Sequence, residues 1–94
     1  MPVVRIEHAV PNFEKWKQAF DSDPADRKGS GVRRYQVSRR RDDPNYIFID
    51  LEFDSAEKAE AFLHVMEGIW SGPGKAVMQG PRASIADLVE TKEL

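Results

Sequence analysis

Cysteine is absent from this sequence of 94 residues, and histidine occurs only twice. The missing thiols exclude disulfides, thiolate metal sites and a cysteine nucleophile. With so few imidazole groups, we also expect no metal site built from the side chains of the chain. Long hydrophobic runs are missing too: no apolar stretch approaches the ~18 residues that span a membrane. The start at Met1-Pro2 carries no apolar signal region. We therefore expect a cytoplasmic protein with no membrane partner.

An excess of charge of either sign is also lacking, since 14 Lys and Arg face 16 Asp and Glu, with a net charge of -2. This balance argues against nucleic acid as a partner. A hydrophobic content of 40% excludes a disordered chain. At this length the sequence predicts one domain over residues 1–94, because there is no room for a second core.

The clearest strand pattern runs from Tyr46 to Phe53. One alternate set of its positions is wholly apolar: Ile47, Ile49, Leu51 and Phe53. The other set becomes polar at its end, at Asp50 and Glu52. This two-residue period predicts a central strand with two different faces. Further strands are predicted over Val3–Val10, Val32–Arg40 and about Ala83–Thr91.

Two helices are predicted from apolar residues that recur three or four positions apart. The first follows Asn12 as its N-cap and is short. The second begins at Asp54 or Ser55, where Asp54-x-x-Glu57 is typical of a capping box. Its apolar stripe is Ala59, Phe62, Leu63, Met66, Ile69 and Trp70. Single turns are expected over Pro24–Arg27 and Lys75–Gln79.

The element order is strand, helix, strand, strand, helix, strand. It predicts an α+β fold of the ferredoxin-like, split βαβ (βαββαβ) type, in which a four-stranded antiparallel sheet carries both helices on one face. The other face is left without a cover. It would carry Arg5, Glu7, Arg34, Gln36, Asp50 and Glu52. Solvation of this face and packing against a second copy remain equal alternatives.

The hairpin between the second and third strands has a register that the face pattern constrains. A loop with an odd number of residues places Tyr35 and Val37 beside the apolar set of Tyr46–Phe53. It also brings Arg34 opposite the acidic positions. A two-residue loop would instead place Arg34 on the apolar face. The free-energy cost of that mismatch would be several times the ~0.2–1 kcal/mol that a cross-strand charge pair contributes. We predict three or five loop residues.

The sequence resembles the dimeric α/β-barrel superfamily, specifically small proteins related to antibiotic-biosynthesis monooxygenases and often labelled cyclases. The residues that carry this resemblance are His8-x-Val10, Phe13-x-x-Trp16-Lys17-x-x-Phe20-Asp21, Arg27 with Gly31, Asp42-Asp43-Pro44-Asn45, Glu52-Phe53 and Ala59-x-Ala61-Phe62. The resemblance implies a homodimer in which two sheets close into a barrel. It also implies a pocket between each sheet and its own helices. Members include cofactor-free oxygenases acting on polyketide-like aromatics, cyclases, isomerases and haem-degrading enzymes.

The chain departs from the haem-degrading members of that superfamily. Those enzymes resemble one another in an Asn, Trp and His set whose His binds iron. Here the nearby candidates are Trp70 and His64, and His64 falls off the apolar stripe of its helix. We therefore expect no cofactor.

The candidate catalytic residues are His8 and Tyr35. His8 shares a strand face with Val4 and Ile6, toward the pocket that the resemblance implies, and an imidazole of pKa ~6.5 suits a general base. A half-buried histidine bonded to backbone is the alternative. Tyr35 lies on the inward face in the odd register and would orient a phenolic ligand, or serve as plain core packing.

The candidate substrate-binding residues are Trp16, Phe20, Arg27 and Trp70. The aromatic rings would stack on an aromatic substrate, although helical spacing also fits core packing. Arg27 would pair with a carboxylate or enolate, or be a solvated loop arginine. Asp50 and Glu52 resemble a paired-carboxylate motif but fall on the opposite sheet face, so we interpret them as structural.

Two functions remain open at this stage. One is a cofactor-independent monooxygenase or cyclase acting on a small apolar aromatic molecule. The other is a non-catalytic small-molecule-binding or assembly module. A cavity beside His8 separates the two, because a filled layer between sheet and helices would leave no room for a substrate.

Overall fold

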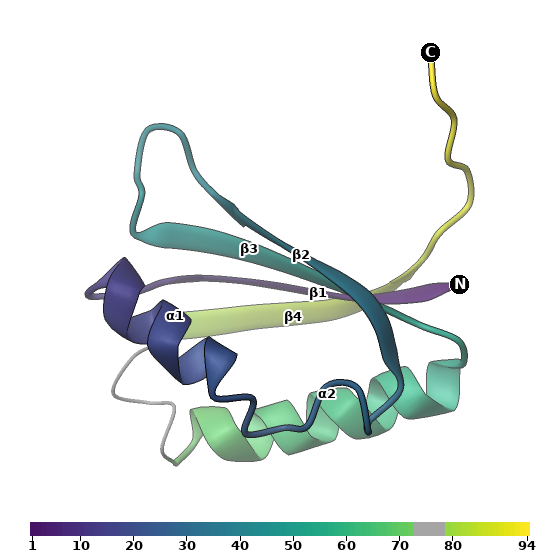
Figure 1. The fold of residues 1–94 in the computed structure, drawn as a ribbon, viewed down its shortest axis with the longest axis horizontal. Helices are drawn as coiled ribbons and strands as arrows, with labels where there is room; N and C mark the ends of the chain where they lie inside the picture. Colours follow the sequence, from purple (N-terminus) through teal and green to yellow (C-terminus); the bar gives the residue numbers. More distant parts are fainter. Residues whose placement is uncertain (73–78) are drawn as a thin grey trace.

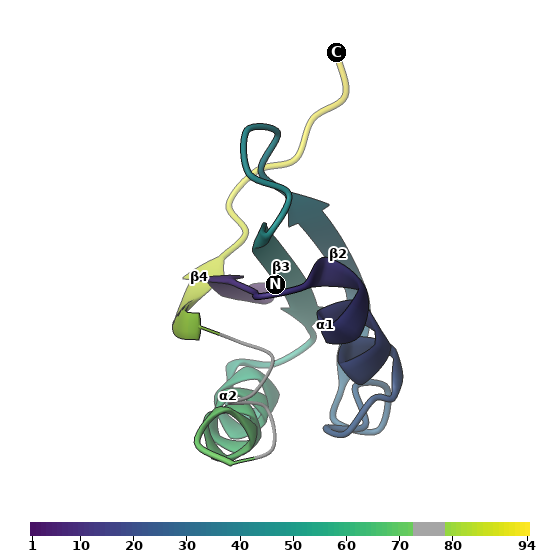
Figure 2. The same cartoon turned by 90° about the vertical axis from the view of Figure 1, so that its left-hand side faces the viewer.

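The computed structural model describes residues 1–72 and 79–94. Its elements, in chain order, are β1 (Pro2–Ala9), α1 (Phe13–Asp21), β2 (Val32–Arg39), β3 (Tyr46–Phe53), α2 (Ala56–Trp70) and β4 (Gln79–Asp87). The strands form one antiparallel sheet in the order β2-β3-β1-β4, and both helices lie on the same side of it (Figures 1 and 2). This arrangement confirms the predicted βαββαβ, ferredoxin-like fold.

The core lies between the sheet and the helices. Alternate residues of β1 and β3 point into this layer, so that Val4, Ile47 and Phe53 are fully covered. From the helices, Trp16 and Phe62 complete the core. The two-residue period therefore separates the faces of the sheet as predicted.

The register of the β2–β3 hairpin is the odd-loop register. Tyr35 pairs with Leu51 and Arg34 pairs with Glu52. The amide of Arg40 donates a hydrogen bond of 2.9 Å to the carbonyl of Tyr46, which leaves residues 41–45 as the loop. The prediction is confirmed, and the acidic positions of β3 lie opposite basic ones.

Both helices begin at a capping side chain. Asn12 caps α1 as predicted. Of the two predicted starts of α2, Ser55 is confirmed as the N-cap and accepts a hydrogen bond of 3.2 Å from the Lys58 amide, so the capping box predicted at Asp54 is wrong. The carboxylate of Asp54 is engaged elsewhere, 2.7 Å from the Nη2 of Arg33. Among the described residues, neither helix is long and apolar enough to cross a membrane.

The predicted bounds of the last strand are wrong. β4 ends at Asp87, which pairs with Pro2, because β1 has no further residue to pair with. One more bond follows, from the amide of Leu88 to the carbonyl of Met1 (3.0 Å). β4 also begins earlier, at Gln79, because Gln79 pairs with Ala9 across a shift in the β1–β4 register, and Gly80 beside this shift has a φ of 57°. Beyond the strand, the chain runs away from the sheet on the side opposite the helices (Figures 1 and 2).

The connection from α1 to β2 consists of turns. The predicted helical turn over Pro24–Arg27 is wrong, because Asp26 has a φ of 48°, which a right-handed helix does not allow. The turn predicted over Lys75–Gln79 lies outside the described residues, apart from Gln79, which opens β4.

Replacement of Phe62 by alanine tests the core. Phe62 is 2% exposed, and its ring centroid lies 5.3 Å from that of Phe53. We expect Phe62→Ala to lower the free energy of unfolding by about 3–5 kcal/mol, because the substitution removes buried contacts and leaves a void. Urea denaturation measures this loss. Glu60→Ala, at an exposed position of the same helix, is the control; equal midpoints for both variants would contradict the core assignment.

Candidate functional site

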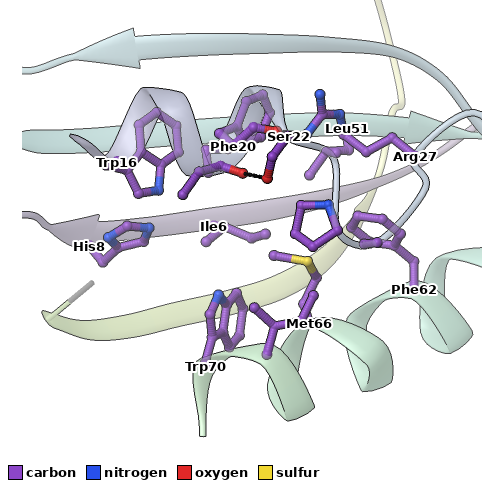
Figure 3. Close-up of a pocket in the computed structure, with 15 residues that line it drawn as sticks. Ile6, His8, Trp16, Phe20, Ser22, Arg27, Leu51, Phe62, Met66 and Trp70 are labelled. Atoms are coloured by element: carbon purple, nitrogen blue, oxygen red, sulfur yellow. Dashed lines mark hydrogen bonds between the residues drawn. The ribbon is translucent and has the colours of Figure 1, made fainter. Parts of the chain in front are cut away.

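A cavity of about 220 Å³ lies between the sheet and the two helices. Residues of β1, β3, α1 and α2 line it, together with the connection after α1 (Figure 3). Most of the lining is apolar and includes Ile6, Ile49, Leu51, Phe62, Met66 and Ile69. We call this space the His8 cavity, after the buried polar residue in its wall.

The two ring nitrogens of His8 have different surroundings. The residue is only 1% exposed, and Nδ1 lies 3.0 Å from the carbonyl oxygen of Ala9. A carbonyl oxygen can only accept, so Nδ1 carries the proton and Nε2 keeps its lone pair. Nε2 is buried and has no hydrogen-bond partner among the described residues. The neutral ring therefore offers an unoccupied acceptor, which is the atom that a general base uses.

Burial keeps this ring neutral. It lowers the pKa of His8 below the ordinary value of 6.5, because an imidazolium ion would lose its hydration in the apolar layer. The hydrogen bond to the Ala9 carbonyl acts in the opposite direction and is the smaller effect. At neutral pH the base form of His8 consequently predominates.

Aromatic rings from α1 form one wall of the His8 cavity. Trp16 meets His8 edge-on, with ring centroids 6.1 Å apart, and stacks on Phe20 at 5.0 Å. Trp16 and Phe20 are four positions apart in α1, so helical geometry places both on the side of the helix that faces the sheet. A flat apolar ligand in the cavity would contact these aromatic rings (Figure 3).

Arg27 closes the cavity from the connection after α1. Its Nη1 donates a hydrogen bond of 2.6 Å to the carbonyl of Phe20, and its Nε lies 3.5 Å from the carboxylate of Asp23. The guanidinium carbon stands 3.9 Å from the ring centroid of Phe20 and 4.9 Å from that of Tyr35. With a side chain only 13% exposed, Arg27 is not a solvated loop arginine. It ties the end of α1 to β2.

Trp70 contributes from the last turn of α2. Its indole Nε1–H is buried and has no acceptor among the described residues. Figure 3 shows its ring at the edge of the same cavity, on the side of α2, with His8 on the side of the sheet. The sequence pattern placed Trp70 in an apolar stripe and gave no signal that its polar atom would lack a partner.

Five of the six predicted site residues come together in this cavity: His8, Trp16, Phe20, Arg27 and Trp70. Tyr35 does not line it. Its ring lies on the predicted face but packs edge-on against Phe20, at 5.3 Å, and beneath Arg27, and it is 43% exposed. The cavity also includes Pro24 and Ala25, for which the sequence gave no functional signal.

The opposite side of the sheet forms a separate surface, which we call the open sheet face: Arg5, Glu7, Arg34, Gln36, Asp50 and Glu52. Arg5 Nε lies 3.0 Å from Asp50 Oδ1, and Arg34 Nε donates to Glu52 Oε2. The two carboxylates thus lie outside the His8 cavity and are paired with arginines, as predicted. His64 is exposed, as predicted. Within the part of the chain that the structure describes, no three His, Cys, Asp or Glu side chains gather as a metal site.

Comparisons with known proteins support the fold. No protein-family model matches the chain, and no curated protein matches it in sequence. Among solved structures, SnoaB, a cofactor-independent oxygenase from Streptomyces nogalater, superposes with a TM-score of 0.75 at 14% identity, covering 96% of this chain and 94% of SnoaB. A candidate antibiotic biosynthesis monooxygenase from Nitrosomonas europaea gives a TM-score of 0.64 at 16% identity, covering 96% of this chain and all of the other (100%).

A dimeric ferredoxin-like protein from an uncultured marine organism is also similar, with a TM-score of 0.66 at 10% identity over 99% of this chain and 98% of the other. The fold is therefore the ferredoxin-like fold that these three proteins share, as the sequence resemblance predicted. At these identities the likeness concerns the fold.

The buried His8 makes stability depend on pH. Because its pKa is lower in the folded chain than the 6.5 of an exposed histidine, the unfolded chain binds a proton first as pH falls. Neutral His8 makes its full contribution to the free energy of unfolding above pH 6.5. This contribution is lost progressively as the pH falls toward the pKa of His8 in the folded chain. We expect His8→Phe to flatten the decline of the melting temperature over this interval, and the exposed His64→Phe to leave it in place. Equal profiles for both variants would contradict the buried neutral state.

Proposed function

We propose that this protein is a cofactor-independent oxygenase that acts on a small phenolic aromatic molecule bound in the His8 cavity. One observation carries the proposal: a buried imidazole with an unoccupied Nε2 lies in the wall of an otherwise apolar, aromatic-lined cavity. A residue that served core packing alone would gain nothing from an acceptor without a donor, since a buried unpaired polar atom costs about 1–3 kcal/mol.

His8 is the proposed general base. Its tautomer is fixed by the Ala9 carbonyl, so Nε2 accepts the proton of a substrate hydroxyl while Nδ1–H stays bonded. The imidazolium and the phenolate then form a charge pair inside the apolar layer, where their attraction is stronger than in water. The rings of Trp16 and Phe20 hold the substrate plane against this base.

The substrate itself supplies the electrons for oxygen. Once His8 removes the hydroxyl proton, the phenolate carries negative charge on a ring carbon, and this carbon bonds to O2. The resulting peroxide takes up the proton from His8, and the hydroperoxide then loses water, breaking its O–O bond and the C–H bond at the same carbon. A phenol and O2 give a quinone and water, so one oxygen atom enters the ring and the other leaves as water.

The likeness to SnoaB supports this reading, because that protein is a cofactor-independent oxygenase of the same fold. The apolar lining supports it as well, since an electron-rich phenolate is protected there from protonation by bulk water. A module that only stores ligands would need the aromatic walls but not the base.

Oxygen uptake with 1-naphthol as the probe tests the proposal. We expect His8→Phe to lower kcat by about 10²–10⁴-fold, the usual contribution of a general base, with the Kd for 1-naphthol changed far less. An oxygen electrode and calorimetry give the two quantities, and the exposed His64→Phe is the matched control.

Two results would contradict the proposal. Undiminished uptake by the His8→Phe variant would remove His8 from catalysis. Conversion of the probe without oxygen uptake would point to isomerisation or cyclisation by the same base.

We further propose that two copies pair through the open sheet face. Half-buried Val3 and Phe48 lie among its ion pairs, and no element of the described chain covers it (Figure 2). The exposed side chains of Leu88 and Val89 extend beyond β4 beside this face, where they would reach a partner. The marine ferredoxin-like protein is itself dimeric.

Charge reversal at Arg34 tests this pairing. In a closed interface, Arg34→Glu would leave an uncompensated acidic cluster with Glu52 and Asp50, so we expect the dimer to weaken. Light scattering over a concentration series measures the midpoint of dimer dissociation. The control is Lys15→Glu, which makes the same charge change on α1, away from the open sheet face. A wild-type protein that is monomeric at micromolar concentration would end the proposal.

A further inference from the structure

Two residues that line the His8 cavity each carry a buried polar atom without a partner among the described residues, and these atoms are of opposite kinds. Nε2 of His8 is an acceptor, because the Ala9 carbonyl holds the ring proton on Nδ1. Nε1–H of Trp70 can only donate. One atom comes from β1 and the other from α2, so they belong to the two layers that enclose the cavity (Figure 3).

A ligand that satisfies both atoms needs a hydroxyl and a separate oxygen acceptor. The hydroxyl would donate to His8, and a carbonyl oxygen would accept from Trp70. If the ring conjugates the two groups, removal of the hydroxyl proton moves negative charge onto the carbonyl oxygen. A fixed indole N–H at that oxygen would stabilise the charge as it develops.

The volume of the His8 cavity limits the size of the ligand. A buried apolar cavity of roughly 150 Å³ binds benzene. The His8 cavity, at about 220 Å³, is larger by about half, which is the increase from one ring to two fused rings. The rings of Trp16 and Phe20 in the lining favour an aromatic ligand. A third fused ring would extend beyond this volume.

We infer that the ligand of this site is a one-ring or fused two-ring hydroxy-ketone, whose hydroxyl binds Nε2 of His8 and whose carbonyl binds Nε1–H of Trp70. This inference rests on the proposed function for the role of His8 as base, and adds the substrate class and the donor that recognises it. Trp70 is thereby a binding residue with a polar role, beyond the apolar stripe of α2.

Four ligands of nearly equal shape distinguish the contact with His8 from the contact with Trp70. Tetralin carries neither group, 5,6,7,8-tetrahydro-2-naphthol carries the hydroxyl, 1-tetralone carries the carbonyl, and 6-hydroxy-1-tetralone carries both in conjugation. We expect calorimetry to rank 6-hydroxy-1-tetralone as the tightest. We expect Trp70→Phe to lower the affinity for the two ketones about tenfold. The affinities for the other two ligands should change little, and by the same factor.

Trp16→Phe is the matched control. It removes the same atoms from the α1 wall of the cavity, but Nε1 of Trp16 is not among the buried unpartnered atoms of the described chain. This variant should alter all four affinities by a common factor. Loss of affinity by all four ligands alike in Trp70→Phe would overturn the inference. So would binding of a three-ring hydroxyanthrone as tight as that of 6-hydroxy-1-tetralone.

A measurement on the wild-type protein keeps the test independent of the folding of the Trp70→Phe variant. The two indole N–H resonances are followed by NMR, with Trp16→Phe assigning them. A downfield shift of the Trp70 resonance with 1-tetralone, and none with tetralin, supports the inference; identical shifts with both overturn it. Oxygen uptake is scored separately, so the oxygenase proposal can fail while the recognition of hydroxyl and carbonyl holds, and the reverse.

Discussion

The alternation of side chains along β1 is the constraint on which the rest of the structure depends. Since neighbouring residues of a strand point to opposite faces, the residue that continues the line of Val4 and Ile6 must enter the layer between sheet and helices, and that residue is His8. Pairing with β3, where His8 stands opposite Ile47, holds this register. A slip of one residue would place Glu7 in the apolar layer instead. A base is thus fixed in a hydrophobic environment by the sheet itself.

The same alternation creates the second surface of the molecule. The residues between those of the core point away from the helices, and register brings Arg5 opposite Asp50 and Arg34 opposite Glu52. Because the arginines of these ion pairs are exposed to solvent, each pair is worth little by itself, about 0–1 kcal/mol. Their value for the fold lies in register, since they match only when the apolar sets match as well. One constraint therefore fixes both the wall of the His8 cavity and the charge pattern of the open sheet face.

Features that depend on alternation were predictable, and features that depend on distant partners were not. The bounds of Tyr46–Phe53 and the odd hairpin register follow from local patterns. The end of β4 follows from where β1 begins, which the residues around Ala83–Thr91 do not encode. In the site, strand face and helical spacing brought His8 and Trp16 together. Tyr35 shows the limit of that logic, because a face does not tell how far along the sheet the cavity reaches.

The hydrogen bonding of His8 differs from that expected of a packing residue. A histidine kept for the core would be expected to satisfy both nitrogens, or to be replaced by an aliphatic side chain of similar size, because a small domain has only about 5–15 kcal/mol of stability. His8 satisfies Nδ1 and leaves Nε2 open, and Trp70 leaves its N–H open in the same cavity. The satisfied nitrogen is the one whose bond fixes the tautomer. This division suits the proton transfer that we propose for His8, and each open atom lowers the stability of the protein without a ligand.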